Sequence, residues 1–106
     1  MLDQRDVRKA TGFEWDRGNR KKCQAHGVSI AEIEDLFTRP VMVLPDPVHS
    51  HAETRMRAIG KTQEGRSVFL VFTMRTGGRK RLIRPISARY MHAKEIKSYE
   101  EESPDL

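Results

Sequence analysis

The chain has 106 residues, 37% of them hydrophobic, which fits one folded domain and excludes a disordered chain or two full-sized domains. Its net charge is +5, and four of its 15 acidic residues lie in the last seven positions, so residues 1–99 carry a net charge of +9. Such a charge attracts polyanions, although many small soluble proteins are also basic. A single cysteine cannot form an internal disulfide, and no cysteine and histidine have the spacing of a zinc site. No apolar run reaches the ~18 residues that a membrane span needs. These features favour the cytoplasm.

The first part of the chain is predicted to be an extension, then a short strand and a basic helix. Residues 1–12 are polar and alternate in charge, so we expect them to lie outside the core of a domain that runs over 13–99. Residues 13–16 alternate apolar and acidic side chains, as a short strand does. Asp16 is suited to cap a following helix that ends at Gly27. Most of that helix is basic, so its surface faces water or an anion.

A second helix is predicted over residues 30–37. Ser29, followed three residues later by Glu32, has the spacing of a capping box, and Val28 with Ile33 occupies the two positions of a hydrophobic staple. Apolar residues recur at helical spacing, which indicates a face that packs on the core. These residues are Ile30, Ile33, Leu36 and Phe37.

The middle of the chain is predicted to form an edge strand, a loop and an alternating strand. Residues 41–44 are apolar and are followed by two prolines, which favour an edge position. The loop after them carries His49 and His51. Residues 54–61 alternate between two faces of a strand. One face carries Met56 and Ala58, and the other carries Arg55, Arg57, Ile59 and Lys61.

The last part of the chain is predicted to add two strands and a helix. The expected elements are a central strand at 67–73, a last strand at 80–87, turns at 62–65 and 76–78, and a helix at 88–101. We expect the helix to dock on the sheet through His92, Ile96 and Tyr99, and residues 100–106 to form an acidic tail.

These elements together predict an α+β fold. It has a short N-terminal strand, two helices, an antiparallel sheet of three to four strands and a C-terminal helix. The helices are expected to cover one face of the sheet. The opposite face, which carries arginines, is then left for function.

The candidate functional residues are basic side chains on strands and at strand ends. No phosphate-binding glycine loop, nucleophile elbow or carboxylate pair is found, and no cofactor is indicated. The fixed fork of a guanidinium group is suited to phosphates, so these side chains predict contacts with RNA. The residues expected to make them are Arg57, Arg79, Lys80, Arg81 and Arg84.

RNA can be cleaved without a metal by a base, a cation at the phosphate and an acid. We expect Arg55 and Arg89 to be the cations, because electrostatic stabilisation is usually the largest catalytic contribution. Glu53 and His49 are close to Arg55 in sequence, and His92 is close to Arg89, so these three are candidates for proton transfer. None of these spacings is specific, since a loop histidine is often only solvated and Glu53 could serve only as a surface ion-pair partner.

Several short motifs, in order along the chain, resemble those of BrnT-type toxins. The motifs are Phe13-Glu14-Trp15-Asp16, His26-Gly27-Val28-Ser29, Asp46-Pro47 with His49, Glu53, Arg55 and Ile59-Gly60, and Ile86-Ser87-Ala88-Arg89. The likeness runs from Phe13 to about Tyr99, and the first residues of the chain extend beyond the usual start of the family.

The resemblance implies a fold like that of the RelE ribonucleases and a bacterial, cytoplasmic ribonuclease that arrests translation. It also implies a ribbon-helix-helix antitoxin as partner, with operator DNA contacted only through the toxin–antitoxin complex. By matching position it implies that Arg55, Glu53, His49 and Arg89 belong to the active site and that Ser87 lies beside them. The competing hypothesis is a non-catalytic protein that binds RNA or the antitoxin and acts in operator regulation.

Overall fold

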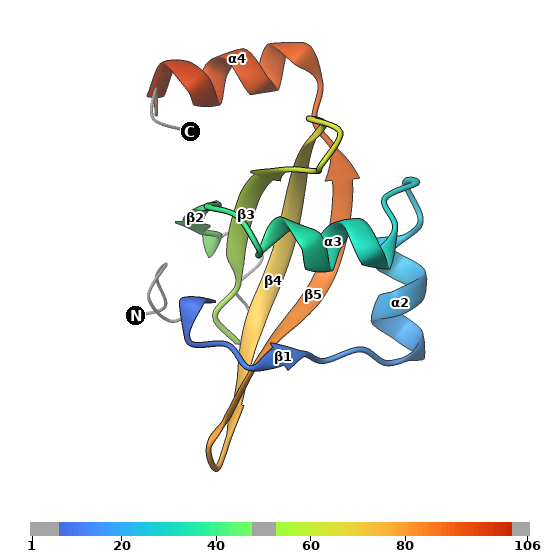
Figure 1. Cartoon of the computed structure of the whole chain (residues 1–106), viewed down its shortest axis with the longest axis vertical. Helices are drawn as coiled ribbons and strands as arrows, with labels where there is room; N and C mark the ends of the chain where they lie inside the picture. Colours follow the sequence, from blue (N-terminus) through green and yellow to red (C-terminus); the bar gives the residue numbers. More distant parts are fainter. Residues whose placement is uncertain (1–6, 48–52, 103–106) are drawn as a thin grey trace.

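The computed structural model describes residues 7–47 and 53–102, which form one sheet with helices (Figure 1). The elements are β1 (Gly12–Phe13), α2 (Arg17–Cys23), α3 (Ile30–Leu36), β2 (Met42–Pro45), β3 (Met56–Lys61), β4 (Ser67–Gly77), β5 (Lys80–Tyr90) and α4 (Ala93–Glu102). The five strands lie in the order β1-β5-β4-β3-β2. The fold is therefore α+β, as predicted, and its order of elements agrees with the RelE-like arrangement that the resemblance implies.

The two edges of the sheet are short strands. β2 pairs antiparallel with β3 and forms one edge, which confirms the position predicted from the prolines around it. β1 forms the other edge and pairs in parallel with β5, with Phe13 opposite Ile83. The sequence predicted only antiparallel pairing, because a two-residue bridge to a partner strand so far along the chain leaves no periodic pattern.

The hydrophobic core lies between the sheet and the two helices α2 and α3. Both helices begin at capping boxes, as predicted, with Asp16 before α2 and Ser29 before α3. Alternation along β3 turns Met56 and Ala58 into the core, which is also as predicted. The largest side chains that are completely buried include Ile33, Leu36, Leu70, Phe72 and Ile83.

The chain before β1 contributes to the core, contrary to expectation. Val7 is only 9% exposed and belongs to the core cluster, and Ala10 packs against it. The prediction that residues 1–12 lie outside the core is therefore wrong for these two side chains. The burial of these two side chains could not be predicted from their polar neighbours in the sequence, because it depends on where the pairing of β1 with β5 places the chain.

Two helix boundaries differ from the prediction. α2 ends at Cys23, and the chain then turns before Gly27, which has a φ of 90°. β5 continues to Tyr90, and α4 begins only at Ala93. The helix-forming composition of the segment after Ser87 is overridden there because its residues pair with β4 and Ala88 is buried.

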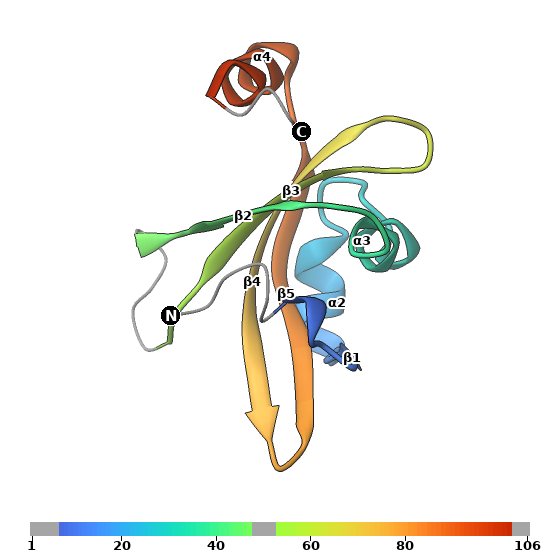
Figure 2. The same ribbon diagram turned by 60° about the vertical axis from the view of Figure 1, so that its left-hand side comes forward.

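The face of the sheet opposite α2 and α3 is not covered by these helices (Figure 2). We call it the open face. Strand pairing places on it Arg57, Ile59, Phe69, Val71, Ser87 and Arg89. α4 lies beyond the end of the sheet where β4 begins and β5 ends, apart from the other helices (Figures 1 and 2). None of the helices in the described residues has the length and apolar composition needed to span a membrane.

Candidate nucleic-acid interface and active site

Arg57 lies near the middle of the open face. It is opposite Val71 on β4, which is in turn opposite Ser87 on β5, so these three side chains share one row across the sheet. The Arg57 Nε donates to the carbonyl oxygen of Pro45 at 3.2 Å, and its Nη1 donates to the hydroxyl of Tyr99 at 3.4 Å. Arg57 therefore connects the edge strand β2 with α4.

Arg89 lies in the next row of the open face, opposite Phe69. Its guanidinium carbon is 4.6 Å from the centroid of the Phe69 ring, and its two terminal nitrogens donate to both oxygens of Glu95 at 2.8 and 2.9 Å. The Arg89 side chain is nevertheless 40% exposed. The aromatic ring and the carboxylate together hold the guanidinium group in one orientation.

Glu95 was not identified from the sequence, and it is the most perturbed acid on this face. Its hydrogen bonds from Arg89, and then that from the His92 N–H at 3.0 Å, lower its pKa to about 2. The same pairing raises the pKa of Arg89. Glu95 follows His92, the residue before α4, by three positions, which is the spacing of the acid in a capping box. This spacing is the sequence feature from which Glu95 could have been identified.

An open groove lies between β3 and α4. It has a volume of about 710 Å³, and its lining includes Arg57, His92, Lys94 and Tyr99. His92 is exposed just before α4 and contributes to the lining of this groove. Arg57 comes from β3, whereas His92 and Lys94 come from the start of α4, so the sequence alone does not predict that they lie at one groove.

Arg55 and Glu53 lie in the segment just before β3, on the N-terminal side of Arg57. Arg55 is half-buried, and its carbonyl oxygen accepts the N–H of Asp46 at 3.0 Å. Glu53 pairs with Arg75 at 3.4 Å. Arg55 lies one residue before β3, so the alternation of that strand does not by itself assign its side chain to a face.

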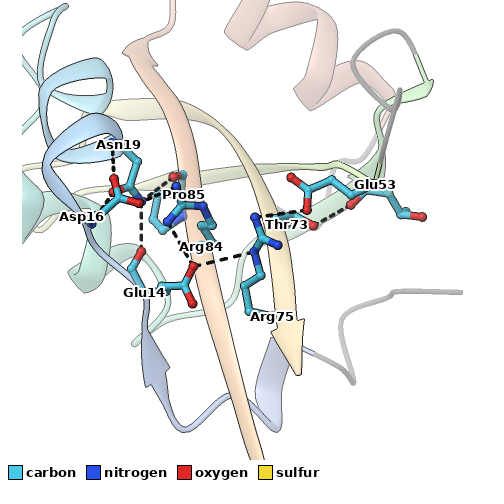
Figure 3. A network of polar contacts seen from close by, with 9 residues as sticks. Glu14, Asp16, Asn19, Glu53, Thr73, Arg75, Arg84 and Pro85 are labelled. Atoms are coloured by element: carbon cyan, nitrogen blue, oxygen red, sulfur yellow. Dashed lines mark hydrogen bonds and ion pairs between the residues drawn. The ribbon is translucent and has the colours of Figure 1, made fainter. Parts of the chain in front are cut away.

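Arg84 lies in a polar network on the β1 side of the sheet (Figure 3). Its guanidinium group pairs with Asp16 at 2.7 Å and with Glu14 at 3.1 Å, and its side chain is 17% exposed. The Asn19 N–H bond and the pairing with Arg84 lower the pKa of Asp16. Through its ion pair with Asp16, Arg84 links the start of α2 to β5, and it does not line the groove.

The other predicted residues are divided between three places. Ser87 lies on the open face in the row of Arg57. Arg79, Lys80 and Arg81 are exposed at the hairpin that joins β4 to β5. His49 and His51 lie outside the described residues. The structure brings together Arg57, Arg89, Ser87 and His92, and it adds Glu95 and Tyr99 to them.

The fold and this face define a small α+β protein with a basic, arginine-bearing surface suited to polyanions. The chain belongs to the BrnT toxin family, since the family model described as "Ribonuclease toxin, BrnT, of type II toxin-antitoxin system" matches residues 15–95. This confirms the resemblance inferred from the motifs, and it makes RNA the substrate and an antitoxin the partner of the family. No curated protein matches the chain.

Proposed function

We propose that the protein cleaves RNA on the open face of its sheet, at the groove beside α4. One observation supports the proposal above all: two arginines from different strands contact α4 one helical turn apart. Arg57 contacts Tyr99, and Arg89 contacts Glu95. His92 lines the same groove. Guanidinium forks bind phosphate oxygens, and an exposed imidazole can transfer a proton near neutral pH.

The proposed reaction needs no metal. The ribose 2′-oxygen attacks the neighbouring phosphorus, the bond from phosphorus to the 5′-oxygen breaks, and a cyclic phosphate and a 5′-hydroxyl form. Arg89 and Arg57 stabilise the charge that develops on the phosphate oxygens. His92 transfers a proton at the groove. We include three further residues in the proposed active site because their positions match those of the family motifs. They are Arg55, Glu53 and His49.

A cleavage assay with purified protein and a chelator tests these roles. Single-turnover cleavage by the variants Arg57→Ala, Arg89→Ala and Arg55→Ala is expected to be at least ~100-fold slower, because each removes a cation from the phosphate. Arg17→Ala, on the exposed surface of α2, is the control for loss of one charge. Unchanged rates in all three variants would contradict the site, and cleavage that requires added magnesium would contradict the metal-free mechanism.

We also propose that the partner is a ribbon-helix-helix antitoxin and that the toxin arrests translation in the bacterial cytoplasm. The support is the resemblance of the motifs together with membership of a type II toxin family. Operator DNA would then be contacted only through the complex. Expression of the toxin alone is expected to stop incorporation of labelled amino acids, and co-expression of a ribbon-helix-helix protein from the adjacent reading frame is expected to restore it.

A second candidate function is supported by the contacts of the same two arginines. Glu95 occupies the fork of Arg89, and Tyr99 contacts Arg57, so both cations already have partners within the chain. A protein that only binds its antitoxin is compatible with such contacts. RNA that stays intact at micromolar protein, in an assay where the antitoxin still binds, would favour this function over cleavage.

A further inference from the structure

The hairpin that joins β4 to β5 extends beyond the rest of the sheet (Figures 1 and 2). The last β4 residue that pairs with β3 is Phe72, and the β1 pairing with β5 reaches only to Leu82. Within the described part of the chain, residues 75–81 therefore have no neighbouring strand on either side, apart from the Thr11 N–H, which donates to the carbonyl oxygen of Arg81 at 2.8 Å, and all of them are exposed. We call these residues the hairpin tip.

The hairpin tip concentrates positive charge. It contains Arg75, Arg79, Lys80 and Arg81, and the sequence has no acidic residue between Glu64 and Glu95. Arg75 is paired with Glu14 and Glu53. The other three cations make no ion pair or hydrogen bond through their side chains with any residue that the structure describes. Several other arginines, such as Arg39, Arg84 and Arg89, are each paired with an acid.

The tip is also a regular hairpin with a defined turn. Gly77 pairs with Lys80 and Thr76 with Arg81, so the turn contains only Gly78 and Arg79. Gly78 has a φ of 58°, the left-handed value that a tight hairpin turn requires at its first position. Lys80 and Arg81 are neighbours on a strand and point to opposite faces of the ribbon. The backbone positions of these residues are thus defined by strand pairing, unlike those of a basic tail without secondary structure.

The chemistry of the tip favours a nucleic-acid backbone over a protein surface. A stable protein interface needs a core of buried apolar side chains, and residues 75–81 supply none. Phosphates need only charge and hydrogen-bond donors, which the three unpaired cations provide. The tip is the continuation of β4 and β5, and β5 also carries Ser87 and Arg89, so an RNA strand lying along the open face can reach it.

We propose that the hairpin tip is a second phosphate-binding site, which holds RNA flanking the point of cleavage. This rests on the proposed function, because the open face is where the RNA is cleaved. Between Lys80 and Arg89 the strand rises about 30 Å, at ~3.3 Å per residue. A stacked nucleic-acid strand rises about 3.4 Å per nucleotide along its axis, so roughly nine stacked nucleotides span the two sites. The proposed substrate is accordingly a stacked RNA strand of about that length.

Binding of uncleavable 2′-O-methyl RNA of graded length tests this proposal. The lengths run from about 4 to about 20 nucleotides, so that they bracket the distance between the two sites. The tip variant is the triple substitution Arg79→Gln, Lys80→Gln and Arg81→Gln. The matched control removes three exposed charges from α2, on the helix-covered side, by Arg17→Gln, Lys21→Gln and Lys22→Gln.

The wild-type protein and the α2 control are expected to gain affinity steeply once the RNA exceeds about nine nucleotides. The tip variant is expected to lack this gain, to bind the longest RNA at least ~10-fold more weakly, and to show a salt slope smaller by about 2. Equal weakening for short and long RNA, equal effects of the two triple variants, or a greater effect on duplex DNA than on RNA would overturn the proposal.

The test separates this proposal from the proposed function. RNA that is bound in the length-dependent way, but not cleaved in its natural form, would contradict cleavage and leave the second site intact. Cleavage that depends on Arg89 but is equally fast for short and long RNA would contradict the second site alone. A wild-type protein that binds no RNA at any length would overturn both.

Discussion

Asn19 shows how one buried polar side chain can join three parts of this fold. It is 5% exposed, and its Nδ2 donates to the carbonyl oxygens of Glu14 and Pro85, each at 2.9 Å. Its Oδ1 accepts the N–H of Asp16 at 2.7 Å. The side chain thus ties the start of α2 both to the segment after β1 and to the middle of β5.

Replacing Asn19 by Ala is expected to lower the free energy of unfolding by about 2–4 kcal/mol, because two buried carbonyl groups lose their donor. Urea denaturation measures the change. The control is Gln24→Ala, which removes an amide that makes only an exposed hydrogen bond to Arg20 and should change stability by less than about 0.5 kcal/mol. A similar small change for both variants would show that the Asn19 bridge contributes little.

The pairing of Glu95 with Arg89 predicts a pH dependence. Because the pKa of Glu95 is lowered to about 2, the stabilisation is complete above its ordinary pKa of 4.5 and is lost as the pH falls towards 2. We expect Glu95→Gln to weaken amide protection of α4 at pH 6 and to have progressively less effect as the protein is acidified. Hydrogen exchange measures this, with Glu100→Gln on the same helix as control. Parallel pH profiles for wild-type protein and Glu95→Gln would contradict the pairing.

At the scale of elements, the close approach of the segment between α3 and β2 to β3 depends on Gly60. A Cβ atom at this position would lie 2.9 Å from Cγ1 of Val41 and 3.4 Å from Cδ2 of Leu36. At Gly77, which is also in a strand, an added Cβ atom would meet no atom of the described residues within 4 Å. The two glycines therefore differ in packing although they share a secondary structure.

We expect Gly60→Ala to destabilise the protein by ~1–3 kcal/mol, since the added methyl group overlaps Val41 in the segment between α3 and β2. Gly77→Ala should change stability by less than about 0.5 kcal/mol. Thermal unfolding of the two variants gives the comparison. If Gly60→Ala were as stable as wild-type protein, the packing of Val41 against β3 would have to be looser than described.

Elements specified by neighbouring residues could be predicted from the sequence. The capping box of Ser29 and Glu32 and the alternation of Met56 with Arg57 depend on spacing within one segment, and both are confirmed. The start of α4 could not be predicted, because residues up to Tyr90 are held in β5 by pairing with β4. Long-range pairing overrides local propensity there.

The candidate site was only partly predictable for the same reason. Arginines on the open face follow from strand alternation, which gives Arg57 its orientation. The contact of Arg89 with Glu95 depends on where α4 begins, and that of Arg57 with Tyr99 depends on where the helix lies. The active-site roles of Arg55, Glu53 and His49 stay predictions.

At the scale of the whole molecule, Cys23 reports on the integrity of the fold. Its side chain is completely buried, and burial raises the pKa of its thiol to about 11. The thiolate is the reactive form, so the folded protein offers a reagent neither access nor a charged sulfur. Its reactivity therefore depends on opening of the core.

Labelling of Cys23 by a thiol reagent at pH 8 is expected to be at least ~100-fold slower in the folded protein than in urea. Addition of uncleavable RNA should slow it further, because a ligand that binds only the folded state stabilises it. A Cys23→Ser variant is the control for reaction elsewhere. Labelling at the unfolded rate without urea would mean that the core around α2 is open.

The shortness of both sheet edges limits how another polypeptide can attach to this molecule. β1 contributes two residues, and β2 contributes four and ends in Pro45, which has no N–H to donate. An incoming strand would therefore gain only a very short backbone ladder against β1 or β2. A partner that approaches either of these two strands has to recognise mainly the side chains around it.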